Sequence, residues 1–170
     1  MQPSGPIPVE ARPLPPSAEV GAPRNLIVFG IVFALAGIVL EGVGYAIFVI
    51  VSGPAQPSGN SRLLVDILYG SQSAGLVFVG IGMFLIFFGA SRLRPASKPW
   101  TTVAAIVLLL TGLVGGILRA SFYLIITGVI AGPPGTSMTT MIELTNEVSG
   151  AVSLLGSVAL IAGLFGLTRS

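Results

Sequence analysis

Nine side chains inside four long, mainly apolar stretches of the chain have the greatest potential for chemistry. Five of them are ionisable as a carboxylic acid or a guanidinium. A charge near the centre of a bilayer costs roughly 2.5 to 3.5 kcal/mol, so such residues rarely persist without a partner or a function. Carboxylates there can carry protons, bind a hard cation or act as acid and base. The predicted intramembrane polar cluster comprises Glu41, Tyr45, Asp66, Tyr69, Arg119, Tyr123, Glu143, Asn146 and Glu147.

Helical spacing groups these residues, because side chains three or four positions apart share one face of a helix. Charged groups turn away from lipid, so we expect the four faces to converge, with Arg119 as the only cation among them. One cation cannot neutralise four carboxylates. Either some carboxyls are protonated, or water, a cation or another subunit enters the layer. The four pairs are Glu41 with Tyr45, Asp66 with Tyr69, Arg119 with Tyr123, and Glu143 with Glu147.

Each of these groups also has a purely structural interpretation. Glu41 and Arg119 would then form an ion pair that sets the register of two helices. Asp66 and Glu143 lie near the outer interface, where a carboxylate reaches water and also favours a helix amino terminus. The tyrosines would be an interfacial belt. Glu147 lies one turn deeper, where solvation is harder to reach.

The composition determines the class of protein that must position these residues. The chain has 170 residues, of which 53% are hydrophobic and 8% charged, and its mean hydropathy is +0.97. A soluble domain of this length needs more polar surface. Each of four apolar stretches exceeds the twenty or so residues that a membrane-spanning helix requires. We therefore predict an all-α membrane protein with a four-helix domain over 25–170, whose spans cover about 25–51, 63–90, 101–131 and 139–168. A proline-rich tail, 1–24, precedes the first span, which we expect to be retained.

The distribution of lysine and arginine predicts the orientation. If the amino terminus is cytoplasmic, Arg62 lies outside, Arg119 lies within the membrane, and the other six of the eight basic residues lie inside. The chain is then a multi-pass protein of the cell membrane with both termini cytoplasmic, and Trp100 is an anchor at the inner interface. The six residues are Arg12, Arg24, Arg92, Arg94, Lys98 and Arg169.

The two halves of the chain resemble each other. A shift of about 78 positions aligns Glu41 and Tyr45 with Arg119 and Tyr123, and a shift of about 77 aligns Asp66 with Glu143. We interpret this as two duplicated helical hairpins, about 25–94 and 103–169, related by a pseudo-twofold axis along the membrane normal. Glu41 would face Arg119 across that axis as an ion pair. Small residues such as Gly30 with Ala34, and Gly112 with Gly115 and Gly116, predict close helix contacts.

The chain lacks the residues that several kinds of chemistry require. The chain contains no cysteine and no histidine, so we expect no thiolate site, no haem and no transition-metal cofactor. It carries neither a phosphate-binding glycine loop nor a nucleophilic serine motif. We predict no nucleic-acid partner, because the basic residues are those that orient the protein. A hard-cation site built from Glu41, Asp66, Glu143 and Glu147 stays open.

Three functions are compatible with this pattern. A non-catalytic accessory or assembly subunit of a larger membrane complex suits a compact chain without cofactor ligands, and its partners would be lipid and other membrane subunits. A small homo-oligomeric transporter or channel would use the acidic layer for protons or cations. A membrane enzyme would use paired carboxylates, but needs a substrate-sized cavity. We rank them in that order.

Overall fold

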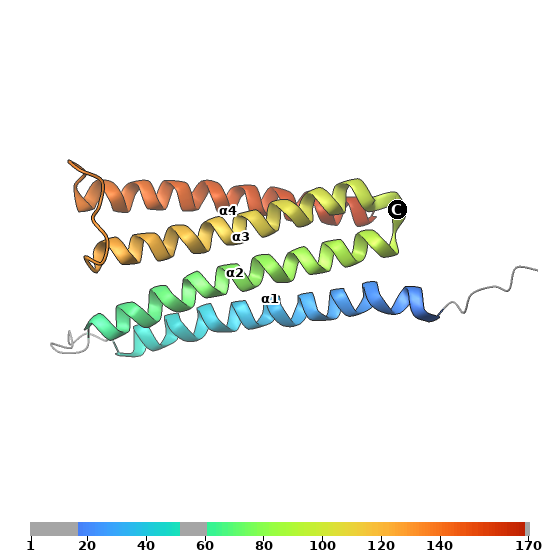
Figure 1. Ribbon diagram of the computed structural model, residues 1–170, viewed down its shortest axis with the longest axis horizontal. Helices are drawn as coiled ribbons and strands as arrows, with labels where there is room; N and C mark the ends of the chain where they lie inside the picture. The colour runs from blue at the N-terminus through green and yellow to red at the C-terminus, as the bar shows by residue number, and fades with distance from the viewer. Residues whose placement is uncertain (1–16, 52–60, 169–170) are drawn as a thin grey trace, which may run out of the picture.

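The computed structural model describes residues 17–51 and 61–168, and nearly all of them are helical (Figure 1). The elements are α1 (Ser17–Val51), α2 (Ser61–Leu93), the short 3₁₀ turn η1 (Pro95–Ser97), α3 (Lys98–Ile126) and α4 (Met138–Thr168). Each α-helix contains a segment long and apolar enough to cross a membrane. The predicted all-α fold with four such helices is therefore confirmed.

The third helix ends five residues earlier than the predicted span, which extended to 131. Gly128 adopts φ +73°, a left-handed conformation that glycine tolerates best. The amide of Gly128 donates to the carbonyl of Ile125 at 3.0 Å, and the amide of Val129 donates to that of Leu124 at 2.9 Å. These two bonds form a Schellman motif, so the local turn stops the helix although the residues that follow are apolar.

The first helix begins at Ser17, inside the segment 1–24 that the sequence analysis describes as a tail. Pro23 lies within this helix. Its carbonyl oxygen approaches α2 so closely that an added Cβ at Gly89 would lie 2.8 Å from it. Proline disfavours the helical turn in which Pro23 lies, and this same turn is in contact with α2. Residues 1–16, with Arg12, and residue Arg169 lie outside the described part.

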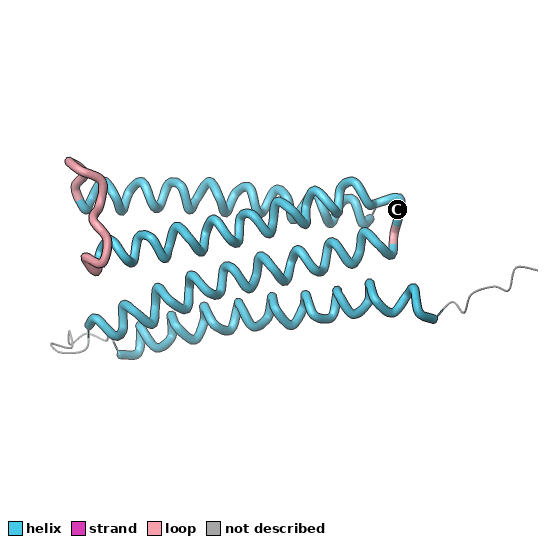
Figure 2. Tube along the Cα trace, in the orientation of Figure 1, coloured by secondary structure: helices cyan, strands magenta, loops and turns pink. Residues whose placement is uncertain are grey.

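The four helices form a bundle in which each helix packs mainly on its neighbours in the sequence: α1 on α2, α2 on α3, and α3 on α4 (Figure 1). Figure 2 shows the described loops only at the two ends of the molecule. We call the end with the α2–α3 connection, near Arg92, Arg94 and Lys98, the basic end. We call the opposite end, with Asp66 and the loop between α3 and α4, the acidic end.

The buried core lies toward the basic end and joins α2, α3 and α4. Phe87 of α2 is 2% exposed and packs with residues of α3 and α4. An added Cβ at Gly163 of α4 would lie 2.5 Å from the ring of Phe87, so the two helices meet there without room for a side chain. The Arg94 guanidinium donates a 2.8 Å hydrogen bond to the carbonyl of Leu167, in the last turn of α4. The core residues are Phe87, Ala104, Ala105, Leu108 and Ala159.

The contact between α1 and α2 is made of glycines at seven-residue intervals on both helices. An added Cβ at Gly82 would lie 2.5 Å from the nitrogen of Ala34 and 2.6 Å from the carbonyl oxygen of Gly30. Backbone therefore meets backbone along this interface, which only small residues permit. The seven-residue spacing keeps the contact on one side of each helix over several turns. The two series are Gly30, Gly37 and Gly44 on α1, and Gly75, Gly82 and Gly89 on α2.

Candidate functional site

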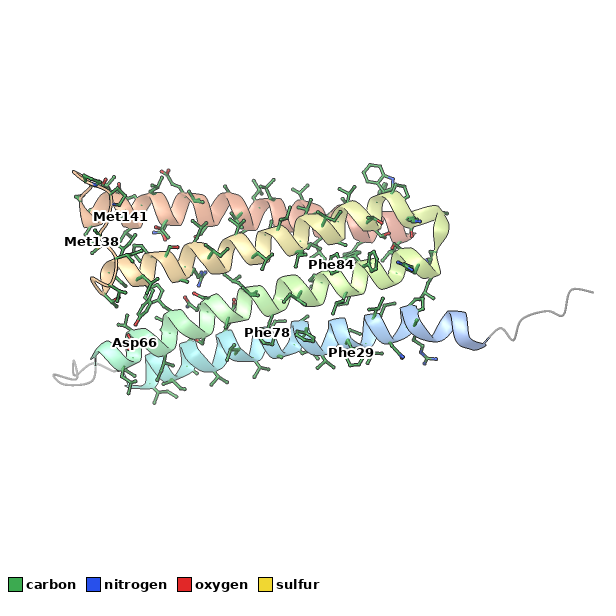
Figure 3. The ribbon with its side chains drawn as sticks, in the orientation of Figure 1. Phe29, Asp66, Phe78, Phe84, Met138 and Met141 are labelled. Carbon is green, nitrogen blue, oxygen red and sulfur yellow. The ribbon has the colours of Figure 1, made fainter. Side chains whose placement is uncertain are left out.

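The polar side chains that meet do so between α2 and α3, toward the acidic end. The hydroxyl of Tyr123 donates a 2.5 Å hydrogen bond to Oδ1 of Asp66. The guanidinium of Arg119 donates a 2.5 Å hydrogen bond to Oε1 of Gln72. The ring of Tyr69 lies 6.1 Å from that of Tyr123. Four of the nine predicted residues, Asp66, Tyr69, Arg119 and Tyr123, thus share one interface, and Figure 3 labels Asp66 at its acidic end.

Gln72 belongs to this group, although the sequence analysis did not select it. It is uncharged, so it does not appear in a search for ionisable residues. It nevertheless lies three positions after Tyr69 and six after Asp66, and therefore shares their side of α2. A search for every hydrogen-bonding side chain on that face would have found it.

Glu41 lies apart from Arg119. Its side chain crosses Gly75 of α2, where an added Cβ would overlap Glu41 Cγ. Oε1 of Glu41 is buried and has no hydrogen-bond partner among the described residues. Arg119 donates its hydrogen bond to Gln72 of α2. The predicted direct ion pair is therefore wrong, because α1 packs mainly on α2, whereas Arg119 reaches α2 from α3.

The other predicted residues lie at the surface of the single chain. Tyr45 is 60% exposed on α1. Glu143 and Glu147 are exposed on α4, and Asn146 is exposed while also lining a cavity. The expected convergence of four polar faces therefore does not include Tyr45, Glu143 and Glu147. The reason is that α4 packs closely on its neighbours at Gly163 and Gly166, near the basic end, whereas a cavity separates it from α2 and α3 at the acidic end.

Two adjoining cavities occupy the space between α2, α3 and α4. The first, which we call the polar cavity, has a volume of about 530 Å³ and lies toward the acidic end. The second, the apolar cavity, has a volume of about 280 Å³ and extends toward the basic end. Arg119 and Ser149 line both, so the cavities meet at the level of the guanidinium. The polar cavity is lined by Tyr69, Gln72, Arg119, Phe122, Ile126, Met138, Ile142, Thr145, Asn146 and Ser149.

The positions of these polar side chains limit the chemistry that the site can support. Within residues 17–51 and 61–168, no group of three or more acidic side chains comes together to hold a metal ion. The hard-cation site left open by the sequence is therefore not assembled by these four carboxylates, because they point from three helices in different directions. The central group is instead a cation, Arg119, with hydrogen-bonding side chains beside it. Comparison with known proteins found no matching protein-family model, no similar curated protein and no similar solved structure.

Proposed function

We propose that the chain is a non-catalytic accessory or assembly subunit of a larger membrane complex, attached through one face of α4. The supporting observation is a row of exposed residues on this helix, separated alternately by four and three positions. Such spacing produces a continuous contact line between two helices. We call this row the α4 stripe. It consists of Glu143, Glu147, Gly150, Leu154, Ser157, Ile161 and Leu164.

The depth of Glu147 is the strongest argument for a partner. At 1.5 Å per residue, α4 is about 46 Å long, and Glu147 lies about 13 Å from its first residue. With about 30 Å of hydrocarbon centred on the helix, Glu147 lies roughly 5 Å below the hydrocarbon boundary. An exposed carboxylate at that depth is costly beside lipid alone. A neighbouring helix that supplies a cation or a hydrogen-bond donor at this level would remove most of the cost.

The rest of the stripe suits the same partner. Gly150 and Ser157 are small enough for a close backbone approach, while Leu154 and Ile161 are 66% and 67% exposed. We therefore expect a partner helix with a basic residue opposite Glu147 and small residues near Gly150. Charge complementarity would select this partner from among other apolar helices.

The test is isolation of the full chain from its native membrane in mild detergent, with identification of what remains bound. We expect a larger membrane protein to co-purify with the wild type and to be lost from Glu147→Leu. The control is Ile117→Ala, which alters an exposed residue of α3 and should retain the partner. A stable, homogeneous preparation of the wild type alone would contradict the proposal.

The orientation and the internal repeat belong to the same proposal. We place the basic end in the cytoplasm because Arg92, Arg94 and Lys98 flank the short α2–α3 connection. The two hairpins would then share an orientation across a pseudo-twofold axis. A cysteine at the exposed Ala96 should react with a membrane-impermeant maleimide only after the cells are permeabilised. Reaction in intact cells would reverse the orientation.

The alternative is a homo-oligomeric transporter or channel for protons or cations. The polar cavity beside Arg119 is the observation that favours it, since it gives a polar space partway into the membrane. In this case the α4 stripe would meet a second copy of the chain, and the acidic residues of several copies would line the path. Proton or cation flux in liposomes that disappears in Glu147→Gln would support this alternative over the accessory role.

A further inference from the structure

The two cavities together form a groove whose polarity changes along its length. Toward the acidic end it presents Gln72, Asn146 and the guanidinium of Arg119. Toward the basic end its walls are mainly apolar and include Leu76, Met83 and Leu160. A molecule that fits this gradient carries a polar head at one end and an alkyl chain at the other.

The depth of Arg119 matches the head of such a molecule. Arg119 lies seven residues before Ile126, the last residue of α3, which is about 10 Å along the helix axis. Because α3 is about 43 Å long and the hydrocarbon layer about 30 Å thick, the guanidinium lies only some 4 Å inside the hydrocarbon boundary. It is therefore within reach of the headgroup level, while the apolar cavity extends toward the middle of the membrane. A lipid of that leaflet has the same direction, with its head outward and its chain inward.

Arg119 also has the capacity to bind an oxyanion. A guanidinium has five N–H donors, and in the described part of the chain one hydrogen bond to a side chain uses them, that to Gln72. Its planar fork matches carboxylate and phosphate oxygens. Two acids lie on α1 and α2: Glu41, which packs across Gly75, and Asp66, which accepts from Tyr123. Neither forms a salt bridge that would occupy Arg119.

The groove is accessible from the surface of the chain. Its wall on α4 includes Asn146, Ser153 and Ser157, all of which are exposed. The polar cavity, at about 530 Å³, has the size of known small-molecule sites, which span about 300 to 1,000 Å³. We infer that the groove between α2, α3 and α4 binds one anionic amphiphile, with its phosphate or carboxylate on Arg119 and an alkyl chain in the apolar cavity.

Native mass spectrometry of the purified full chain tests this site. The protein is supplied in turn with phosphatidylglycerol, phosphatidylcholine or oleate at equal concentration. We expect one bound molecule of an anionic amphiphile and weak binding of zwitterionic phosphatidylcholine. Arg119→Gln should reduce the bound fraction about tenfold or more, because a hydrogen bond to a charged group is lost. Arg24→Gln removes an exposed cation of α1 and should leave binding unchanged.

A second pair of variants tests the groove without removing a charge. Gly156→Leu should block it, because an added Cβ there makes only ordinary contact with Thr111 at 3.4 Å and the longer side chain extends into the apolar cavity. Gly42→Leu on α1 is the control, since nothing lies within 4 Å of its added Cβ and it lines neither cavity. This pair decides the question if Arg119→Gln fails to fold.

The outcomes separate the source of the ligand from the existence of the site. Binding of phosphatidylglycerol supports a membrane phospholipid, and binding of oleate alone supports a free acyl anion. Equal binding of phosphatidylcholine and phosphatidylglycerol would overturn the proposal. So would binding that is unchanged in both Arg119→Gln and Gly156→Leu. These results do not depend on whether the chain is an accessory subunit.

Discussion

The α1–α2 and α3–α4 pairs, which the sequence aligns as repeats, pack in opposite ways. Glycines bring the backbones of α1 and α2 together along most of their length. Helices α3 and α4 meet closely only near the basic end, and the groove separates α4 from α2 and α3 toward the acidic end. Helices α1 and α2 pack closely along most of their length, whereas α3 and α4 leave a groove and an exposed polar face.

At some aligned positions the residues differ in size between the two pairs. With the shifts of about 77 and 78, Gly75 of α2 corresponds to Val152 of α4, and Gly44 of α1 corresponds to Phe122 of α3. These larger side chains line the cavities or lie beside them. Gly89 corresponds to Gly166, which packs against Trp100 where α3 and α4 are in contact. Gly37, however, corresponds to Gly115, which keeps the small residue and lines the apolar cavity, so residue size alone does not decide where the helices meet.

The largest effect that tests this contrast is expected for Gly82→Ala. Its new Cβ would lie 2.5 Å from a backbone nitrogen of α1, so α1 and α2 must separate. Overpacking of this kind costs about 1 to 3 kcal/mol, offset by up to about 1 kcal/mol of improved helix propensity. The free energy of unfolding, followed in mixed micelles by the fluorescence of Trp100, should fall by about 1 to 2 kcal/mol.

The matched variant in the α3–α4 pair is Gly156→Ala. The new Cβ would lie 3.4 Å from Thr111, which is ordinary contact, so only the gain in helix propensity remains. We expect unchanged stability or an increase of up to about 1 kcal/mol. Equal destabilisation by the two variants would remove the distinction between the two pairs.

An intermediate effect is expected for the hydrogen bond between Tyr123 and Asp66, which joins the two halves of the chain. Hydrogen bonds within membranes contribute about 0.6 kcal/mol on average, and a charged acceptor strengthens them. A double-mutant cycle of Tyr123→Phe and Asp66→Asn should give a coupling of about 1 kcal/mol. Tyr45→Phe, at a side chain that is 60% exposed, should change stability by less than about 0.5 kcal/mol. A coupling near zero would show that the 2.5 Å contact does not hold α2 and α3 together.

The smallest effect is expected at the basic end, where α3 and α4 are in contact. Arg94→Gln removes the hydrogen bond to Leu167 and a positive charge near the carboxyl end of α4. We expect a loss of about 0.5 to 1 kcal/mol, seen as faster amide hydrogen exchange in the last turn of α4. Lys98→Gln removes a nearby exposed cation and should not change that exchange. Equal acceleration in both variants would indicate a general electrostatic effect.

The sequence predicts the four helices well because their apolar stretches far exceed the length that a membrane requires. It predicts the end of α3 poorly, because the left-handed turn at Gly128 overrides the apolar residues that follow. The glycine series on α1 and α2 is visible in the sequence as a seven-residue interval, although the small-residue contacts predicted from the sequence have shorter spacings. The sequence does not predict which helix each glycine series contacts, because the interval identifies one face of a helix and not the neighbouring helix.

The same limit applies to the candidate site. Helical spacing pairs Asp66 with Tyr69 on one face. It does not show that Tyr123 donates a hydrogen bond to Asp66, or that Glu41 lies at another interface. The rule that charged groups turn inward fails for Glu143 and Glu147, which are exposed on α4 in the single chain.

Site-specific photocrosslinking in the native membrane tests most directly whether the α4 stripe is covered by another protein. A photoreactive residue is placed at Leu154, in the centre of the stripe, or at Ile117 on α3, which is 62% exposed. We predict one discrete crosslinked membrane protein from Leu154, lost in Glu147→Leu, and none from Ile117. Crosslinks from Leu154 to lipid alone, or the same products from both positions, would contradict the account.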